Sequence, residues 1–144
     1  MAVDNIANNG GPFGVIIVDK EGKVVARTAN SVTRTNDPTA HAEICAIREA
    51  CKNLNTYILE GCTMYSSCEP CPMCLGAIYW SRLSKLYFGA TRKDAADGGF
   101  DDDFIYTEIP KPLNERTLPT INLRDENSPK PFQLWVSEAN KKHY

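Results

Sequence analysis

The sequence lacks the features that direct a chain into or across a membrane. No apolar run approaches the roughly 20 residues that a membrane-spanning helix requires, and no basic segment followed by an apolar one opens the chain. We therefore expect a cytoplasmic protein. A charge excess is absent too, since sixteen basic and eighteen acidic residues give a net charge of -2. Affinity for phosphate backbones comes mainly from clustered lysine and arginine, so this balance argues against a nucleic-acid partner.

A length of 144 residues and the lack of internal repeats predict a single domain over residues 1–144. Apolar, β-branched segments predict strands at residues 13–18, 23–29, 62–67 and 85–89. Helices are predicted to open at Asp37-Pro38, at Pro72 and near Pro131, because proline is favoured in the first helical turn. Strands that alternate with helices predict an α/β layered domain with parallel pairing in its centre.

The three predicted helices differ in their apolar faces. In the first helix, Ile44, Ile47 and Cys51 recur at helical spacing and predict the buried face. The second, from Pro72 to Trp80, has almost no polar side and is predicted to be buried all round. The last carries an apolar stripe at positions i, i+3, i+4 and i+7, formed by Phe132, Trp135, Val136 and Ala139. This stripe must be covered by something.

Six cysteines in a chain that is expected to stay reduced indicate metal binding rather than disulfides. Cys71 and Cys74 flank Pro72 at a strand-to-helix junction, and a helix N-terminus favours the thiolate form. We expect His41 to be the third ligand of a zinc ion. Glu43 follows two residues later, and it reaches the same site only if its helix points its N-terminal end at the metal.

His41-Ala42-Glu43 and Pro70-Cys71-Pro72-Met73-Cys74 together form the His-x-Glu and Pro-Cys-x-x-Cys signature of zinc deaminases. In such a site zinc acidifies a water molecule and a carboxylate that is not a ligand takes the proton. Glu43 is the candidate for that base. A closed structural zinc site with Cys68 as fourth ligand is one alternative, and a redox pair of cysteines is another.

With these motifs, the sequence resembles the cytidine and deoxycytidylate deaminase superfamily, and within it the bacterial-type guanine deaminases. The resemblance extends from about Gly10 to Tyr144 and includes Gly10-Gly11-Pro12-Phe13-Gly14 and Phe100-Asp101-Asp102. It implies a three-layer α/β/α fold with a mixed central sheet. Such proteins carry a full helix before the Gly-Gly-Pro-Phe loop, and only nine residues precede Gly10 here, so we expect that helix to be shortened or cut off.

The resemblance also implies a reaction, the hydrolysis of guanine to xanthine and ammonia. It implies a catalytic role for Asp102, which assists departure of the amine. The residues that it places around the base are Asn30, Phe13, Ala42, Trp80 and Tyr144. Alternatives are a deaminase of guanosine or cytosine, a transfer-RNA adenosine deaminase, and a non-catalytic zinc-binding interaction module that has no need of Glu43.

The apolar stripe of the last helix suggests how the protein assembles. The resemblance implies a homodimer in which the segment 131–144 is exchanged, so that Tyr144 closes the partner's site. Exchange of identical elements is a low-cost route to a symmetric dimer. The alternative is that the stripe packs on its own domain and Tyr144 is a frayed end.

Overall fold

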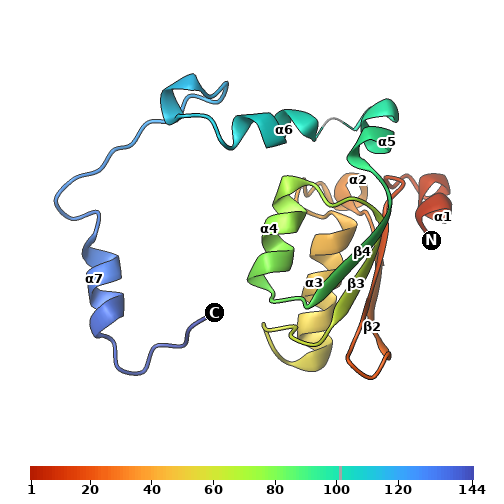
Figure 1. Cartoon of the computed structure of the whole chain (residues 1–144), viewed down its shortest axis with the longest axis horizontal. Coiled ribbons are helices and arrows are strands. Elements are labelled where there is room, and N and C mark those ends of the chain that lie inside the picture. Colours follow the sequence, from red (N-terminus) through yellow and green to blue (C-terminus); the bar gives the residue numbers. More distant parts are fainter. Residues whose placement is uncertain (101) are drawn as a thin grey trace. The chain divides into compact units, whose positions relative to one another are not determined.

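The computed structural model describes residues 1–100 and 102–144, so Asp101 of the quoted Phe-Asp-Asp motif lies outside the described residues. The chain divides into two units, Met1–Phe104 and Ile105–Tyr144 (Figure 1). The single domain expected over residues 1–144 stays a prediction. No helix in the described part of the chain is long and apolar enough to cross a membrane.

A four-stranded sheet in the order β2-β1-β3-β4 forms the centre of the first unit (Figure 1). The strands are β1 (Gly14–Val18), β2 (Val24–Ala29), β3 (Thr63–Cys68) and β4 (Lys85–Ala90). β1 runs antiparallel to β2 and to β3, whereas β3 and β4 are parallel. The parallel pair requires a crossover, which a helix supplies. The mixed sheet is therefore confirmed.

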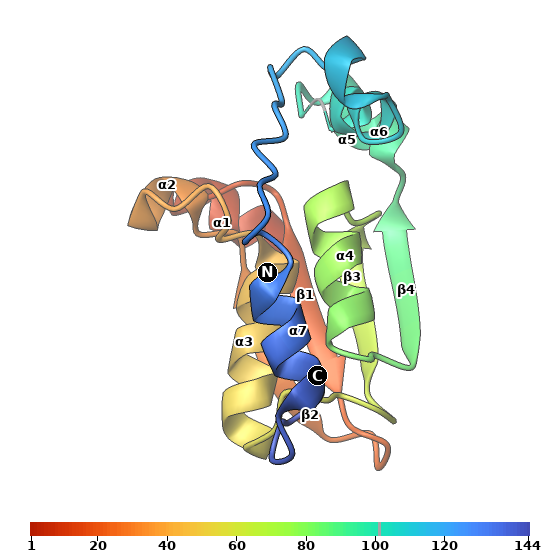
Figure 2. The ribbon, with the colours of Figure 1, turned by 90° about the vertical axis from the view of Figure 1, so that its left-hand side faces the viewer.

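Helices lie on both faces of this sheet. The helices of the first unit are α1 (Ala2–Ala7), α2 (Val32–Thr35), α3 (Ala42–Leu54), α4 (Pro72–Trp80) and α5 (Arg92–Asp97). A further helix, α6 (Asp103–Glu108), begins at the end of this unit and lies mostly in the second. α3 and α4 contact each other and cover one face (Figure 2). α1 packs on the other, where a Cβ at Gly14 would come within 3.3 Å of the backbone nitrogen of Ala2. The three-layer α/β/α fold is confirmed, with a short α1 as the second helical layer.

The start of α3 corrects one prediction. Asp37-Pro38 does not open the helix, because the carboxylate of Asp37 accepts hydrogen bonds from the backbone and hydroxyl of Thr39 and closes a turn instead. The helix begins at Ala42, and His41 is its N-cap with an extended backbone. The ring of His41 therefore leaves the helix at its tip.

The buried face of α3 corrects a second prediction. Ala42, Ala46 and Ala50 are fully buried. Of the predicted inner residues, Ile47 and Cys51 are partly buried and pack against the core, whereas Ile44 is partly buried and is not part of that packing. Alanine occupies the positions that face β1 and β2, the strands that α3 contacts. The core beneath it contains Val15, Ile17, Leu59 and Met64, all fully buried.

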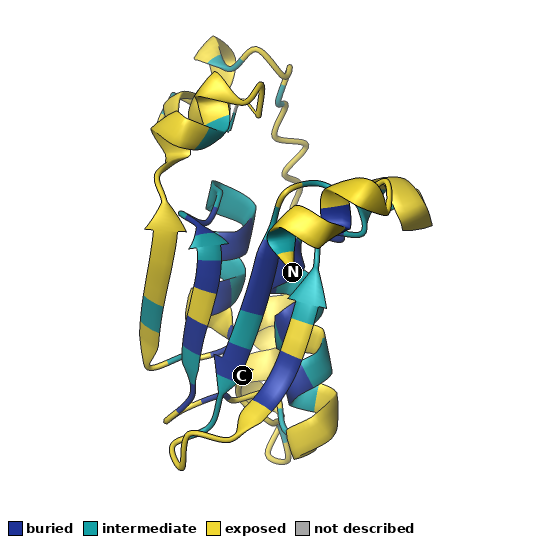
Figure 3. Ribbon diagram, turned by 90° about the vertical axis from the view of Figure 1, so that its right-hand side faces the viewer, coloured by how far each residue is buried: buried dark blue, intermediate teal, exposed yellow. Residues whose placement is uncertain are grey.

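α4 is not buried all round, contrary to expectation. Only Cys74 and Ile78 are buried, and Tyr79 and Trp80 are exposed. The neighbouring β4 is also largely exposed, as Figure 3 shows by its yellow colour. A helix with almost no polar side chain thus leaves one apolar side uncovered in a single chain.

The second unit contains the 3₁₀ helix η1 (Leu113–Glu115) and α7 (Lys130–Ser137). Near its start, the carboxylate of Glu108 accepts hydrogen bonds from Lys111 and from the backbone N–H of Thr117. The predicted last helix is confirmed, but it ends at Ser137, so Ala139 of the predicted stripe lies beyond it. The other stripe residues, Phe132, Trp135 and Val136, are exposed. The last helix therefore has an apolar face that is exposed in the chain as described.

Candidate metal centre and active site

Two helix N-termini converge in the first unit and bring three metal-ligating side chains together. His41 is the N-cap of α3, Cys71 is the N-cap of α4, and Cys74 lies in the first turn of α4. Nδ1 of His41 lies 3.5 Å from the Sγ atoms of both cysteines, and the three donor atoms all lie within 4.8 Å of one another.

The geometry of this cluster fits zinc. Tetrahedral bonds of about 2.3 Å to sulfur and 2.0–2.1 Å to nitrogen put a sulfur and a nitrogen ligand about 3.6 Å apart. The two observed separations of 3.5 Å match that value. Two thiolates and one imidazole are also the donor types that zinc prefers.

The surroundings favour ionisation of one of the two thiols, that of Cys71. Hydrogen bonds from Cys74 and His41 lower the pKa of Cys71 to about 4, although burial opposes this. The pKa of the Cys74 thiol is raised, mainly by its hydrogen bond with Cys71 and to a smaller extent by burial. The pKa of His41 is raised by its contact with Cys71. A divalent cation held by these residues would meet one thiolate, that of Cys71, and would have to displace protons from Cys74 and His41.

Cys68, the fourth ligand of the closed-site alternative, does not join the cluster. Its thiol points to the backbone carbonyl of Thr91, at 3.6 Å, and the donor group found among the described residues contains only His41, Cys71 and Cys74. Three protein ligands leave one tetrahedral position for water or substrate, as in catalytic zinc sites.

Glu43 stands beside the cluster and is 4% exposed. Its Oε1 accepts a hydrogen bond from the hydroxyl of Ser66, at 3.0 Å, and its Oε2 lies 3.5 Å from Sγ of Cys74. Buried carboxylates need such partners, and these two fix the carboxylate in one orientation. It is therefore placed to exchange protons with whatever occupies the open metal position.

A cavity of about 260 Å³ opens onto the cluster. His41, Glu43 and Cys71 form its polar floor, and Phe13 and Phe100 belong to its apolar lining. The two phenylalanine rings meet edge to face with their centroids 4.9 Å apart. This volume lies just below the range of about 300–1,000 Å³ typical of small-molecule sites, so the cavity suits one small planar ligand.

Asn30 also lines the cavity, at the end of β2. Its backbone N–H donates to the carbonyl of Phe13, at 3.1 Å. The side-chain oxygen accepts the N–H of Val32, at 3.2 Å, in a local turn. The oxygen of the amide is thus partly engaged, which leaves its N–H groups as donors for a ligand.

Asp102 lines the same cavity and has an unusual environment. Its Oδ1 is buried and has no hydrogen-bond partner among the described residues. Burial and the nearby negative charge of Cys71 raise the pKa of this carboxyl group. A buried oxygen without a partner is costly, and such groups cluster where a ligand is to be bound.

The other residues implied by the resemblance are placed differently. Ala42 is fully buried behind His41, and its carbonyl accepts a hydrogen bond from the hydroxyl of Thr28. Trp80 ends α4, nine residues after the cap at Cys71, so about 13 Å of helix separates it from the cluster. The cavity lining, as far as the chain is described, does not include Trp80. Tyr144 belongs to the second unit.

Two contributions to the site escaped the sequence argument. The first is Ser66, whose hydroxyl donates a hydrogen bond to Glu43. Its signal in the sequence is a polar residue at an inward-facing position of β3, between buried Met64 and Cys68.

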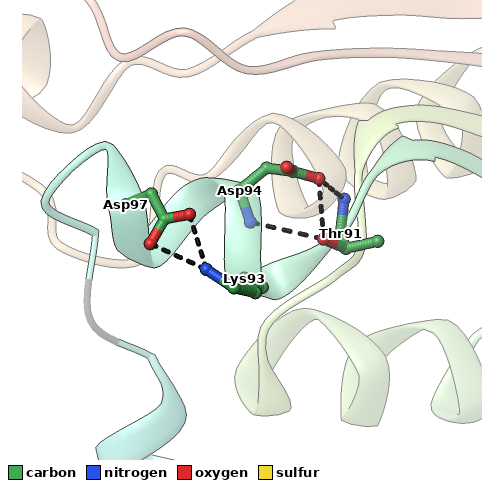
Figure 4. A network of polar contacts seen from close by, with 4 residues as sticks. All are labelled: Thr91, Lys93, Asp94 and Asp97. Carbon is green, nitrogen blue, oxygen red and sulfur yellow. Dashed lines mark hydrogen bonds and ion pairs between the residues drawn. The ribbon is translucent and has the colours of Figure 1, made fainter.

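The second contribution is the part of the cavity wall that α5 forms. Thr91 and Asp94 form a capping box at its start, and Lys93 pairs with Asp97 at 2.7 Å (Figure 4). These bonds fix the helix that carries Ala95 of the cavity lining.

Comparison with known proteins agrees with this site. Residues 2–90 match the model of the cytidine and deoxycytidylate deaminase zinc-binding region. A guanine deaminase of Bacillus subtilis is 55% identical over 138 residues, which cover 96% of this chain and 88% of that protein. The X-ray structure of guanine deaminase from Bacillus subtilis superposes with a TM-score of 0.96 at 52% identity, over 99% of this chain and 91% of that one. A tRNA-specific adenosine deaminase of Aquifex aeolicus is 48% identical over 105 residues, or 73% of this chain and 67% of that protein.

Proposed function

Because this chain belongs to the cytidine and deoxycytidylate deaminase family of zinc proteins, we propose that it hydrolyses guanine to xanthine and ammonia. One observation carries the proposal: a buried carboxylate, Glu43, and a three-donor metal cluster open into one small cavity with aromatic walls. The guanine deaminase relative matches 138 residues, against 105 for the adenosine deaminase of transfer RNA, so the likeness to the former includes more of the chain.

His41, Cys71 and Cys74 are the proposed ligands of the zinc ion. The ion supplies Lewis acidity, which makes a water molecule acidic enough to lose a proton near neutral pH. Glu43 accepts that proton, because its Oε2 faces the cluster and its Oε1 is held by Ser66. The water oxygen forms a bond to the ring carbon that carries the exocyclic amine, and Glu43 delivers the proton to the adjacent ring nitrogen.

Departure of ammonia needs a further proton on the amine. Asp102 is the proposed donor, since its raised pKa keeps a proton on the carboxyl group at a higher pH than usual. When the amine leaves, the carbon–nitrogen bond breaks and its electron pair goes to the departing ammonia. The added hydroxyl gives its proton to Glu43, which has already delivered the first one to the ring, and its oxygen becomes the carbonyl of xanthine. Proton exchange with solvent then restores Glu43 and Asp102. Phe13 and Phe100 enclose the ring, and the amide of Asn30 donates to the edge of the base.

A free base is the proposed substrate, and nucleic acid is not. The cavity has room for one small ring system, and the net charge of -2 supplies little attraction for a phosphate backbone. The test is ammonia release by the zinc-loaded protein from guanine, guanosine, cytosine, adenine and transfer RNA. We expect guanine to be preferred. Deamination of adenosine in folded RNA would overturn the proposal.

We also propose that the working form is a homodimer with exchanged C-terminal segments. Within a single chain, Tyr79 and Trp80 of α4 are exposed, and so are Phe132, Trp135 and Val136 of the last helix. Burying such surfaces is favourable by about 25 cal/mol per Å², so two incomplete apolar faces are a reason to associate. In this proposal residues 131–144 cover the partner and Tyr144 closes its cavity.

Complementation tests the exchange. Deleting residues 140–144 is expected to reduce guanine turnover and leave zinc content unchanged. Mixing this deletion with a Glu43→Gln chain is expected to restore activity, because the site with an intact Glu43 then receives the intact tail of its partner. No recovery after heterodimers are confirmed by mass would show that each tail serves its own chain.

A further inference from the structure

A buried amide on α1 links three segments that meet at the substrate cavity. Asn5 is 5% exposed, although it lies on a short helix near the start of the chain. Its Nδ2 donates to the backbone carbonyl of Gly11, at 2.8 Å, and to that of Asn30, at 2.9 Å. Both acceptors belong to residues that line the cavity. One side chain thus ties the loop before β1 to the end of β2.

The orientation of this amide is fixed by a neighbouring cation. Nη1 of Arg34 donates to Oδ1 of Asn5, at 3.2 Å, and Nη2 donates to the hydroxyl of Ser31, at 2.7 Å. A guanidinium group has only donors, so the oxygen of Asn5 must face it. The nitrogen of Asn5 then faces the two carbonyls, and a flipped amide would leave all three contacts mismatched.

The loop before β1 is shaped around Asn5. The N–H of Gly10 donates to the backbone carbonyl of Asn5, at 2.9 Å. A Cβ at Gly10 would lie 2.2 Å from Nδ2 of Asn5, so only glycine leaves room for the amide. A Cβ at Gly11 would lie 3.2 Å from Cγ of Asn30, so the side chain of Asn30 packs directly on this loop. Asn5 therefore controls where the loop and Asn30 stand relative to each other.

We propose that Asn5 is a positioning residue for the substrate, which sets the place of Asn30 and Gly11 in the cavity wall. The proposal rests on the proposed function in one respect, namely that Asn30 contacts the base. Asn5 itself is not in the cavity lining given by the described residues and acts through Asn30. Since Asn30 holds the base before and during the reaction, its displacement should raise KM and change kcat little.

The sharpest variant is Asn5→Asp, which keeps the shape but replaces the donor nitrogen by an oxygen. That oxygen faces the carbonyls of Gly11 and Asn30, and lost or reversed buried hydrogen bonds of this kind correspond to about tenfold in binding. We expect KM for guanine to rise about tenfold, with kcat within about twofold and zinc content unchanged. An unchanged KM would overturn the proposal.

Asn53→Asp makes the same chemical change at an asparagine that is exposed, and it is the control. Nδ2 of Asn53 also donates to a backbone carbonyl, that of Val25, at 2.9 Å, and it ties α3 to β2 as Asn5 ties α1 to Asn30. Neither residue lines the cavity in the described part of the chain. We expect a lower melting temperature and an unchanged KM. A rise in KM as large as that of Asn5→Asp would mean that general loss of stability explains both results.

Two further measurements separate positioning from stability. In an Asn30→Ala background, Asn5→Asp is expected to raise KM by less than about twofold, because the residue through which it acts is gone. An equal factor in both backgrounds would contradict the proposal. If Asn5→Asp does not fold, Arg34→Leu removes the group that orients the amide, together with its hydrogen bond to the hydroxyl of Ser31, and it should raise KM about threefold.

A readout that needs no substrate keeps the two proposals distinct. The nuclear magnetic resonance signals of the Asn30 side-chain amide and of the Val32 backbone N–H, which are hydrogen-bonded partners, report the position of Asn30. Both should shift in Asn5→Ala and stay in place in Asn53→Ala. Unmoved signals would overturn the positioning role. A wild-type enzyme that does not act on guanine, with signals that do shift, would contradict the proposed function alone.

Discussion

Glu43→Gln removes a base from the site and leaves its shape. Oε1 of Glu43 accepts a hydrogen bond from Ser66, at 3.0 Å, and Oε2 lies 3.5 Å from Sγ of Cys74. A glutamine keeps an oxygen for the hydroxyl of Ser66 and places an N–H donor beside the sulfur of Cys74. The buried contacts therefore remain satisfied, and the variant is expected to fold and to retain zinc.

We expect a loss in rate because the amide of a glutamine does not accept a proton from water, as the carboxylate of Glu43 is proposed to do. General acid–base catalysis by one positioned group typically contributes about 10²–10⁴-fold. Glu43 is proposed to take a proton from water and to deliver one to the ring, so we expect at least the upper end, about 10⁴-fold in kcat, or roughly 5 kcal/mol of barrier. KM should change little, because the variant leaves in place Asn30 and Phe13, the residues proposed to contact the base.

The assay is steady-state release of ammonia from guanine, together with metal analysis of the same preparation. Glu49→Gln is the matched control, since it makes the same chemical change on the same helix, where Oε1 of Glu49 accepts the N–H of Arg27 at 3.4 Å. This control should keep near wild-type turnover. A zinc-loaded Glu43→Gln enzyme within tenfold of wild type would refute the reasoning and place the base elsewhere.

Two other variants test the metal cluster and the wall of the cavity. Cys71→Ser is expected to lose zinc and Cys68→Ser to retain it, because only Cys71 belongs to the donor cluster; loss of zinc from Cys68→Ser in metal analysis would reveal a fourth protein ligand. Thr91→Val removes the N-cap of α5 and should lower the free energy of unfolding in urea by about 1 kcal/mol. In the same variant the pKa of Asp94, now lowered mainly by the hydroxyl of Thr91, should return towards 3.8. A lowered folded pKa stabilises the protein above the unfolded value, and this contribution is lost as pH falls through the folded pKa. An unchanged Asp94 titration in Thr91→Val would contradict the capping box.

The metal cluster was within reach of sequence reasoning because its determinants are local. Pro72 marks the first turn of α4, and the spacing of Cys71 and Cys74 then places both sulfurs at the helix tip. His41 required one more step, the convergence of a second helix tip on the first. The His-x-Glu pattern supplies that step only if His41 is a cap, and the structure shows that it is one.

The extent and faces of α3 were not predictable from the same signals. Asp37 and Pro38 are favourable at a helix start, but the carboxylate of Asp37 is used within a turn by Thr39. Such local hydrogen bonds compete with helix formation, and the sequence does not show which wins. The inner face was assigned from large apolar residues such as Ile44, but the residues that α3 presents to the sheet are the small Ala46 and Ala50.

Exposed apolar residues on α4 show a different limit. Periodicity reports that a side chain is apolar, and so predicts that something covers it, but it does not say whether that cover belongs to the same chain. Tyr79 and Trp80 are exposed here, together with most of β4. The prediction of a fully buried helix is therefore wrong for the chain as described, and the proposed dimer would supply a cover for its exposed side.

Buried polar side chains were the part of the site that the sequence concealed most. Ser66 lies 23 residues from Glu43, and Asn5 lies 25 residues from Asn30, so no local pattern connects either pair. Ser66 nevertheless breaks a rule that can be checked in a sequence, because it is polar at an inward position of a strand, between two buried residues. A polar group is tolerated there only with a partner, and the partner it demands is a residue of the site. Searching predicted inward positions for polar residues would therefore have found Ser66, whereas Asn5, on a six-residue helix with no clear inner face, needed the fold.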